Sequence, residues 1–200
     1  MAVKLGTTFV FAVVICAAIG TRAAELRLTV LDGENGKVVP CRVHLKDPGG
    51  KPVHPRGLPF WHDHFVCAGD LKLDLAPGSY TYEIDRGPEY LLATGASSVA
   101  ESAPQRVTKR LQRLANLAQE NWWSGELHVH RAPAEIELLM QAEDLHVAPV
   151  ITWWNDRNLW KDRALPSPAL VRFDQDRFYH LLGGEDERFW QEKLNLANSE

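Results

Sequence analysis

The sequence lacks the motifs of several common enzyme classes. It contains no glycine-rich phosphate loop and no Gly-x-Ser-x-Gly turn, and no cysteine is placed with a histidine as a nucleophile and base. These absences give no support to nucleotide binding, serine hydrolysis or cysteine-nucleophile chemistry. Candidate chemistry has to come from other residues.

A long hydrophobic run is also missing. The apolar run at residues 9–19 is too short to span a bilayer, which takes about 20 apolar residues. Lys4 precedes it, and Thr21 and Ala23 place small residues where a signal peptidase reads. We therefore predict a secretory signal peptide over residues 1–23, no stable membrane span, and a secreted or periplasmic location. The alternative is a short N-terminal anchor.

Cysteine is scarce, and the chain carries a small net negative charge. Cys41 and Cys67 follow the predicted leader, and the sequence leaves open whether they pair or stay as buried thiols. Loss of Lys4 and Arg22 with the leader changes the formal net charge from −4 to −6. No basic stripe remains, so we expect no nucleic-acid partner.

Short alternating apolar runs separated by turn residues fill the first half of the chain. The runs lie at residues 26–30, 42–45, 71–75 and 80–84. Period-two alternation with Pro/Gly turns predicts an all-β sandwich domain over residues 24–114. Residues 105–119 fit either a helix or a last strand followed by a short helical linker.

An α/β rhythm follows a linker at residues 115–124. We expect strands at residues 125–129, 147–152 and 178–182, with a helix from Pro133 to Leu145. Strand–helix–strand spacing predicts parallel pairing. Three strands and one helix cannot close a barrel, so residues 125–200 are expected to be the first, incomplete part of an α/β domain.

His128 and His130 form the sharpest candidate for chemistry. On a strand, residues i and i+2 point to the same side, so the imidazoles converge while Leu127 and Val129 face the core. The end of a parallel strand is where α/β sites form. Imidazole is a common ligand of first-row metals. We therefore predict a metal site here.

Glu185 follows the third expected strand in an acidic turn. A carboxylate added to two histidines suits zinc, manganese or iron, so Glu185 is the predicted third ligand of a divalent metal. The alternative is a solvated acidic turn.

Residues 123–130 (Trp-Ser-Gly-Glu-Leu-His-Val-His) resemble the opening motif of the PHP-type metal-dependent hydrolases, most closely the secreted CehA/McbA family. Residues 76–82 and 86–90 are similar to the carboxypeptidase-regulatory-like sandwich that often precedes it. The resemblance implies a distorted PHP-like barrel whose metal ions activate water against a phosphoester or other ester-like bond. It matches His128, His130 and Glu185 to metal ligands, and it favours the strand-and-linker interpretation of residues 105–119.

The second motif departs from that family. Thr-Asp-His-Asn is usual there, and this chain has Thr152-Trp153-Trp154-Asn155. Indole cannot ligate a metal. A register shift would bring Asp156 to the position, and the later ligands of the family would lie beyond Glu200.

Four residues are candidate substrate contacts. Arg131 would hold an anion or pair with a neighbouring carboxylate. Trp153, Trp154 and Asp156 lie in a loop whose aromatic and polar groups suit a glycan or small-molecule substrate, and the alternative is a loop packed down by its tryptophans. Elsewhere, His62-Asp63-His64 is interpreted as a polar turn, and His44 as an ordinary strand histidine.

Two functions follow. The first is a secreted metal-dependent hydrolase, incomplete in this chain. The alternative is a non-catalytic extracytoplasmic carbohydrate- or protein-binding module with a degenerate metal site.

Overall fold

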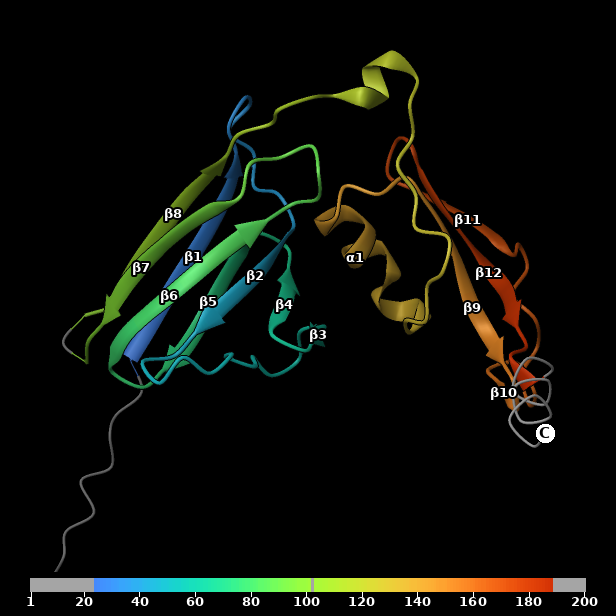
Figure 1. The fold of residues 1–200 in the computed structure, drawn as a ribbon, viewed down its shortest axis with the longest axis horizontal. Helices are drawn as coiled ribbons and strands as arrows, with labels where there is room; N and C mark the ends of the chain where they lie inside the picture. Colours follow the sequence, from blue (N-terminus) through green and yellow to red (C-terminus); the bar gives the residue numbers. More distant parts are fainter. Residues whose placement is uncertain (1–23, 102, 189–200) are drawn as a thin grey trace, which may run out of the picture.

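The computed structural model describes residues 24–101 and 103–188, and the predicted signal peptide lies outside them. Strands dominate this part of the chain (Figure 1). No helix in it is long and apolar enough to cross a membrane.

Two sheets pack face to face in the first part of the chain. Their strands are β1 (Ala24–Asp32), β2 (Cys41–Lys46), β3 (Phe60–Trp61), β4 (His64–Cys67), β5 (Asp70–Leu75), β6 (Gly78–Asp85), β7 (Ala93–Val99) and β8 (Gln105–Leu111). One sheet has the order β5-β1-β8 and the other β3-β4-β2-β6-β7. Alternate residues of both sheets point inward and share one apolar core, in which Val30, Val43, Phe65 and Ile84 are fully buried.

Cys41 and Cys67 lie opposite each other in this core, on β2 and β4. Both are free thiols with their sulfur atoms 3.8 Å apart. Their hydrogen bond and burial raise the pKa of the Cys41 thiol. The sandwich is therefore built on apolar burial without a disulfide between this pair.

The second part of the chain is a smaller sheet with one helix. Its elements are the 3-10 turns η1 (Leu117–Glu120) and η2 (Pro133–Glu135), helix α1 (Ile136–Ala142), and strands β9 (Val147–Trp154), β10 (Arg157–Asn158), β11 (Leu170–Phe173) and β12 (Arg177–Glu185). The sheet order is β10-β9-β12-β11, and β9 and β12 run parallel. Ile136 and Met140 of α1 pack on Val150 and Tyr179 of this sheet.

The predicted PHP-like α/β barrel is wrong. The described residues are nearly all strand and loop, with α1 as their single α-helix of seven residues. The loop predicted to follow residue 152 contains the short edge strand β10, which pairs antiparallel with β9. Beyond that loop, β11 forms the other edge strand and pairs antiparallel with β12. Residues 125–129 form isolated bridges from Gly125 and Val129 to β9 rather than a strand.

Helix α1 lies between the sandwich and the second sheet (Figure 1). Besides packing on β9 and β12, it contacts β2 and β4 of the sandwich. Gly87 follows β6 and approaches this region closely, because a Cβ there would lie 2.2 Å from the carbonyl oxygen of Glu143. The two parts are thus joined through the end of α1.

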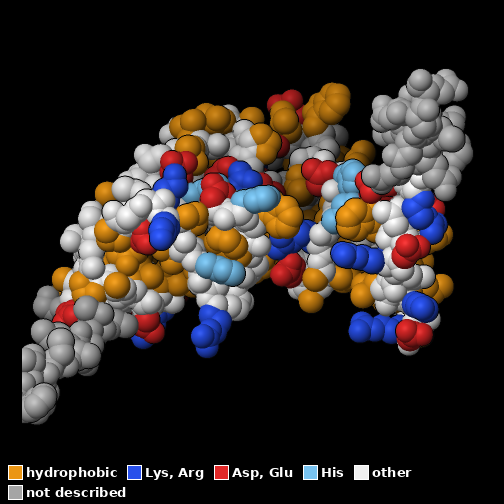
Figure 2. Space-filling view, turned by 60° about the horizontal axis from the view of Figure 1, so that its bottom comes forward, with side chains coloured by type: hydrophobic (Ala, Val, Ile, Leu, Met, Phe, Trp, Pro, Cys, Tyr) orange, Lys and Arg blue, Asp and Glu red, His pale blue; other side chains and the backbone are white. Residues whose placement is uncertain are grey.

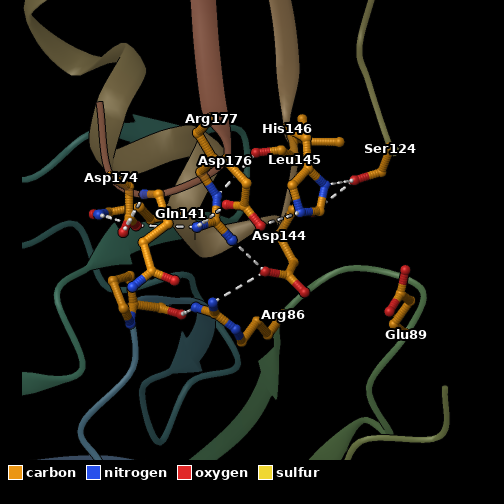
Figure 3. Close-up of polar contacts among 12 residues, drawn as sticks. Arg86, Glu89, Ser124, Gln141, Asp144, Leu145, His146, Asp174, Asp176 and Arg177 are labelled. Atoms are coloured by element: carbon orange, nitrogen blue, oxygen red, sulfur yellow. Dashed lines mark hydrogen bonds and ion pairs between the residues drawn. The ribbon is translucent and has the colours of Figure 1, made fainter. Parts of the chain in front are cut away.

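Asp144, two residues after the end of α1, ties the two parts together by charge (Figure 3). Its carboxylate accepts hydrogen bonds from Arg86 (3.2 Å) and Arg113 (2.7 Å) of the first part and from Arg177 (2.5 Å) of β12. Asp144 is buried, and all three guanidinium groups are largely buried. Charge-assisted hydrogen bonds of this kind are strong because little water competes for them.

Candidate metal centre

His128, His130 and Glu185 meet at the ends of the second sheet. The Nε2 atoms of the two histidines are 2.9 Å apart, and Oε2 of Glu185 lies 3.1 Å from the first and 2.8 Å from the second. The histidine side chains are 60% and 34% exposed and the glutamate 24%. Three candidate ligand atoms from two segments of the chain therefore form a small triangle that solvent can reach.

The local backbone explains this convergence. Val129 bridges Val150 of β9 in parallel, which holds the segment against the sheet edge with residues 128 and 130 on one side of it. Glu185 ends β12 and pairs in register with Trp154, the last residue of β9. Leu127 does not face the core as predicted but is 75% exposed, because only two isolated bridges hold this segment.

The triangle suits a cation better than it suits internal hydrogen bonds. With three contacts of nearly equal length, an N–H aimed along one edge points about 60° away from the other, and hydrogen bonds weaken steeply off line. Tetrahedral zinc places adjacent ligand atoms about 3.3–3.5 Å apart. The present spacings reach that value with a movement of a few tenths of an ångström.

A cavity of about 340 Å³ adjoins the histidines. It lies between the sandwich and α1. Its lining includes His128 and His130 from the candidate site, Phe60 and Trp61 of β3, and Leu139 of α1. The sequence did not predict Phe60 and Trp61 as site residues, although they stand in a conspicuous Pro59-Phe60-Trp61 run. Only the packing of the two parts brings them to the cavity.

The predicted substrate contacts fall into two groups, one beside His130 and one with its contacts elsewhere. Arg131 pairs with Glu135 at 2.9 Å, which matches the neighbouring-carboxylate alternative. Trp154 lies beside His130, with ring centres 4.9 Å apart. Arg131, Trp154 and Asp156 all line a second hollow of about 610 Å³, which His130 also borders.

Two of the predicted residues make their polar contacts away from the candidate metal ligands. Asp156 is 87% exposed and pairs with Arg188, so the register shift that would make it a ligand does not occur. Trp153 is half exposed, and its indole N–H donates to the backbone oxygen of Asn155. Trp160, by contrast, packs on the core of the second sheet and donates to Thr152, so part of this loop is packed down by tryptophan.

No family model matches this chain, and no curated protein matches it in sequence. Among solved structures it is similar to GBS52, the minor pilin of Streptococcus agalactiae (16% identity, TM-score 0.36, 48% of this chain and 46% of that one). It is also similar to BcpA, the major pilin subunit of Bacillus cereus (18%, 0.36, 46% and 30%), and to the pilus 2b backbone protein of group B streptococcus (14%, 0.37, 48% and 43%). The matches span less than half of each pilin.

The expected membership of the PHP-type hydrolases, in the CehA/McbA family, is therefore wrong. No family model supports it, and the barrel that the family requires is not formed by the described residues. The hydrolase activity that the resemblance implies is withdrawn with it. The meeting of His128, His130 and Glu185 does not depend on that resemblance.

Proposed function

We propose that this protein is a non-catalytic extracytoplasmic binding module that holds a divalent transition metal on His128, His130 and Glu185. The observation that carries the proposal is the triangle of three ligand atoms at 2.8–3.1 Å. The extracytoplasmic location rests on the predicted signal peptide at residues 1–23.

The donor set favours a borderline metal. Two imidazoles and one carboxylate suit zinc, manganese or iron, whereas calcium and magnesium prefer oxygen ligands throughout. Among the divalent ions, affinity for such a site rises from manganese through iron and is higher again for zinc. We expect zinc to bind more tightly than manganese, and magnesium not to compete.

The metal could bind an outside ligand because three protein ligands do not complete its coordination shell. Three protein ligands leave at least one coordination position for an outside donor. The adjoining cavity carries the apolar side chains of Phe60, Trp61 and Leu139. A small molecule with an oxygen donor at one end and an apolar body fits this combination.

Zinc affinity, measured by isothermal titration in a competing buffer, tests the metal site. We expect His128→Ala and Glu185→Gln to weaken zinc binding at this site at least 100-fold. His62→Ala, which removes an exposed histidine outside the triangle, is the matched control and should bind as the native protein does. Equal affinity in all four proteins would refute the site.

Benzohydroxamate tests the binding role, since it joins an oxygen donor to an apolar ring. We expect it to bind the zinc-loaded protein and neither the metal-free protein nor zinc-treated His128→Ala. Equal binding with and without zinc would show that the metal does not take part in ligand binding.

A further inference from the structure

A second group of metal-ligating side chains lies on the sandwich. His44 belongs to β2, Asp63 to the turn after β3, and His64 to the start of β4. Nδ1 of His44 lies 3.2 Å from one oxygen of Asp63, and Nδ1 of His64 lies 3.1 Å from the other. One ligand atom from each residue falls within 4.8 Å of the others.

Strand register brings the two histidines together. Val43 pairs with Phe65 across β2 and β4, so the next pair outward is His44 with His64, and their ring centres are 4.8 Å apart. Val43 and Phe65 point into the sandwich core, so the histidines point to the opposite face, the one that α1 contacts. The two-residue turn between β3 and β4 then places Asp63 against both rings.

The charges and exposure at this group suit a divalent cation. Two neutral imidazoles and one carboxylate carry a net charge of −1. Arg42, two residues before His44 on the same face, is already neutralised by ion pairs with Asp85 and Glu143. The histidine side chains are largely buried, while Asp63 is half exposed and leaves a path for an entering ion.

We propose that His44, Asp63 and His64 form a second site for a divalent first-row transition metal. His64 lines the same cavity as His128 and His130, so one ligand of the second site and two ligands of the first border a common cavity. Figure 2 shows histidine side chains on both parts of the molecule. A metal here would also fasten the β3–β4 turn, and with it Phe60 and Trp61 of the cavity wall, to β2.

Zinc stoichiometry, measured by equilibrium dialysis and elemental analysis of the purified protein, tests this second site. We expect two zinc ions per native chain and one per chain in Asp63→Asn, which keeps the size of the side chain. The double variant His44→Ala/His64→Ala should also hold one. His62→Ala, which changes the neighbouring exposed histidine of the same turn, should hold two.

The same measurement separates this inference from the proposed function. The double variant His128→Ala/His130→Ala should hold one zinc ion, and its combination with Asp63→Asn should hold none. If the native chain holds one ion that only the His128/His130 variant loses, the second site is refuted and the first stands. If only Asp63→Asn loses it, the proposed function fails and the second site stands. Near-ultraviolet circular dichroism of each variant shows whether the fold is kept.

Discussion

Asp144 connects the two parts of the molecule through its charge. One buried carboxylate faces Arg86, Arg113 and Arg177, so its negative charge is shared by three guanidinium groups from three segments. Desolvated cations are tolerated only while a partner compensates them. The residue at position 144 therefore affects how the two parts are arranged around the cavity and the candidate metal site.

We expect Asp144→Asn to lower the free energy of unfolding by about 3–5 kcal/mol, because three largely buried guanidinium groups lose their shared counter-charge. Urea denaturation followed by tryptophan fluorescence measures the change. Asp156→Asn is the control, since that carboxylate is on the surface, and it should unfold as the native protein does. Equal stability of the two variants would show that the cluster does not hold the parts together.

Glu143, the neighbour of Asp144, gives a pH-dependent prediction. Burial raises the pKa of its carboxyl above the ordinary 4.5, against the opposing effect of Arg42. The folded state then holds this proton more tightly than the unfolded state, so the contribution of Glu143 to stability is full below pH 4.5 and is lost as the pH rises through its folded pKa. Glutamine at this position cannot ionise, so the variant does not lose stability in this way as the pH rises.

The stability of Glu143→Gln relative to the native protein should therefore increase from pH 4 to pH 7. Urea denaturation of both proteins at each pH gives the difference, in which the titration of all other groups cancels to first order. A relative stability that stays constant or falls over this range would contradict the raised pKa.

At the scale of elements, the contact between Gly87 and the end of α1 decides how closely the sandwich approaches the second part. Gly87 has φ of +73°, and any Cβ there would collide with the carbonyl of Glu143 at 2.2 Å. Gly57 has a similar φ of +80° with no atom near its absent Cβ. Comparing alanine substitutions at Gly57 and Gly87 therefore separates the free-energy cost of backbone strain from the cost of the collision with Glu143.

We expect Gly57→Ala to cost about 1–2 kcal/mol, the usual penalty for a left-handed alanine. Gly87→Ala should cost clearly more, because the backbone of α1 has to move away from β6 as well. Thermal unfolding of the two variants measures the difference. The same loss in both would show that the approach of Glu143 to Gly87 does not constrain the joint.

Local patterns predicted elements well where the structure depends on local sequence. The alternating runs at residues 26–30, 42–45, 71–75 and 80–84 coincide with β1, β2, β5 and β6, because one face of each strand is buried. The pairing of β11 with β12 was missed, since it depends on a contact formed only after folding. The prediction of a barrel was wrong because a parallel pair such as β9 and β12 does not imply that further helices follow.

The candidate site also has features that local sequence predicts and features that depend on packing. The spacing of His128 and His130 and the strand-end position of Glu185 are local features, and the structure brings these three together. The cavity wall from β3 could not be predicted, because it depends on how the sandwich packs on α1. The group of His44 with Asp63 and His64 was missed too, since the residues are joined by the β2–β4 register and not by sequence spacing. That these groups bind metal stays a prediction.

For the whole molecule, a metal on His128, His130 and Glu185 would join segments 55 to 57 residues apart in sequence. An ion that binds only the folded state stabilises it by about 2.7 kcal/mol at a free concentration of 100 Kd. We expect zinc at that level to raise the unfolding temperature of the native protein. In His128→Ala/His130→Ala, the rise should shrink to what the second site contributes, and no change in the shift would contradict this link.

The most direct test of the metal centre is a crystal structure of the zinc-loaded protein with anomalous data collected on both sides of the zinc edge. The account predicts an anomalous peak at about 2.0–2.2 Å from Nε2 of His128, Nε2 of His130 and a carboxylate oxygen of Glu185. Density at these three side chains without a zinc peak among them would contradict it.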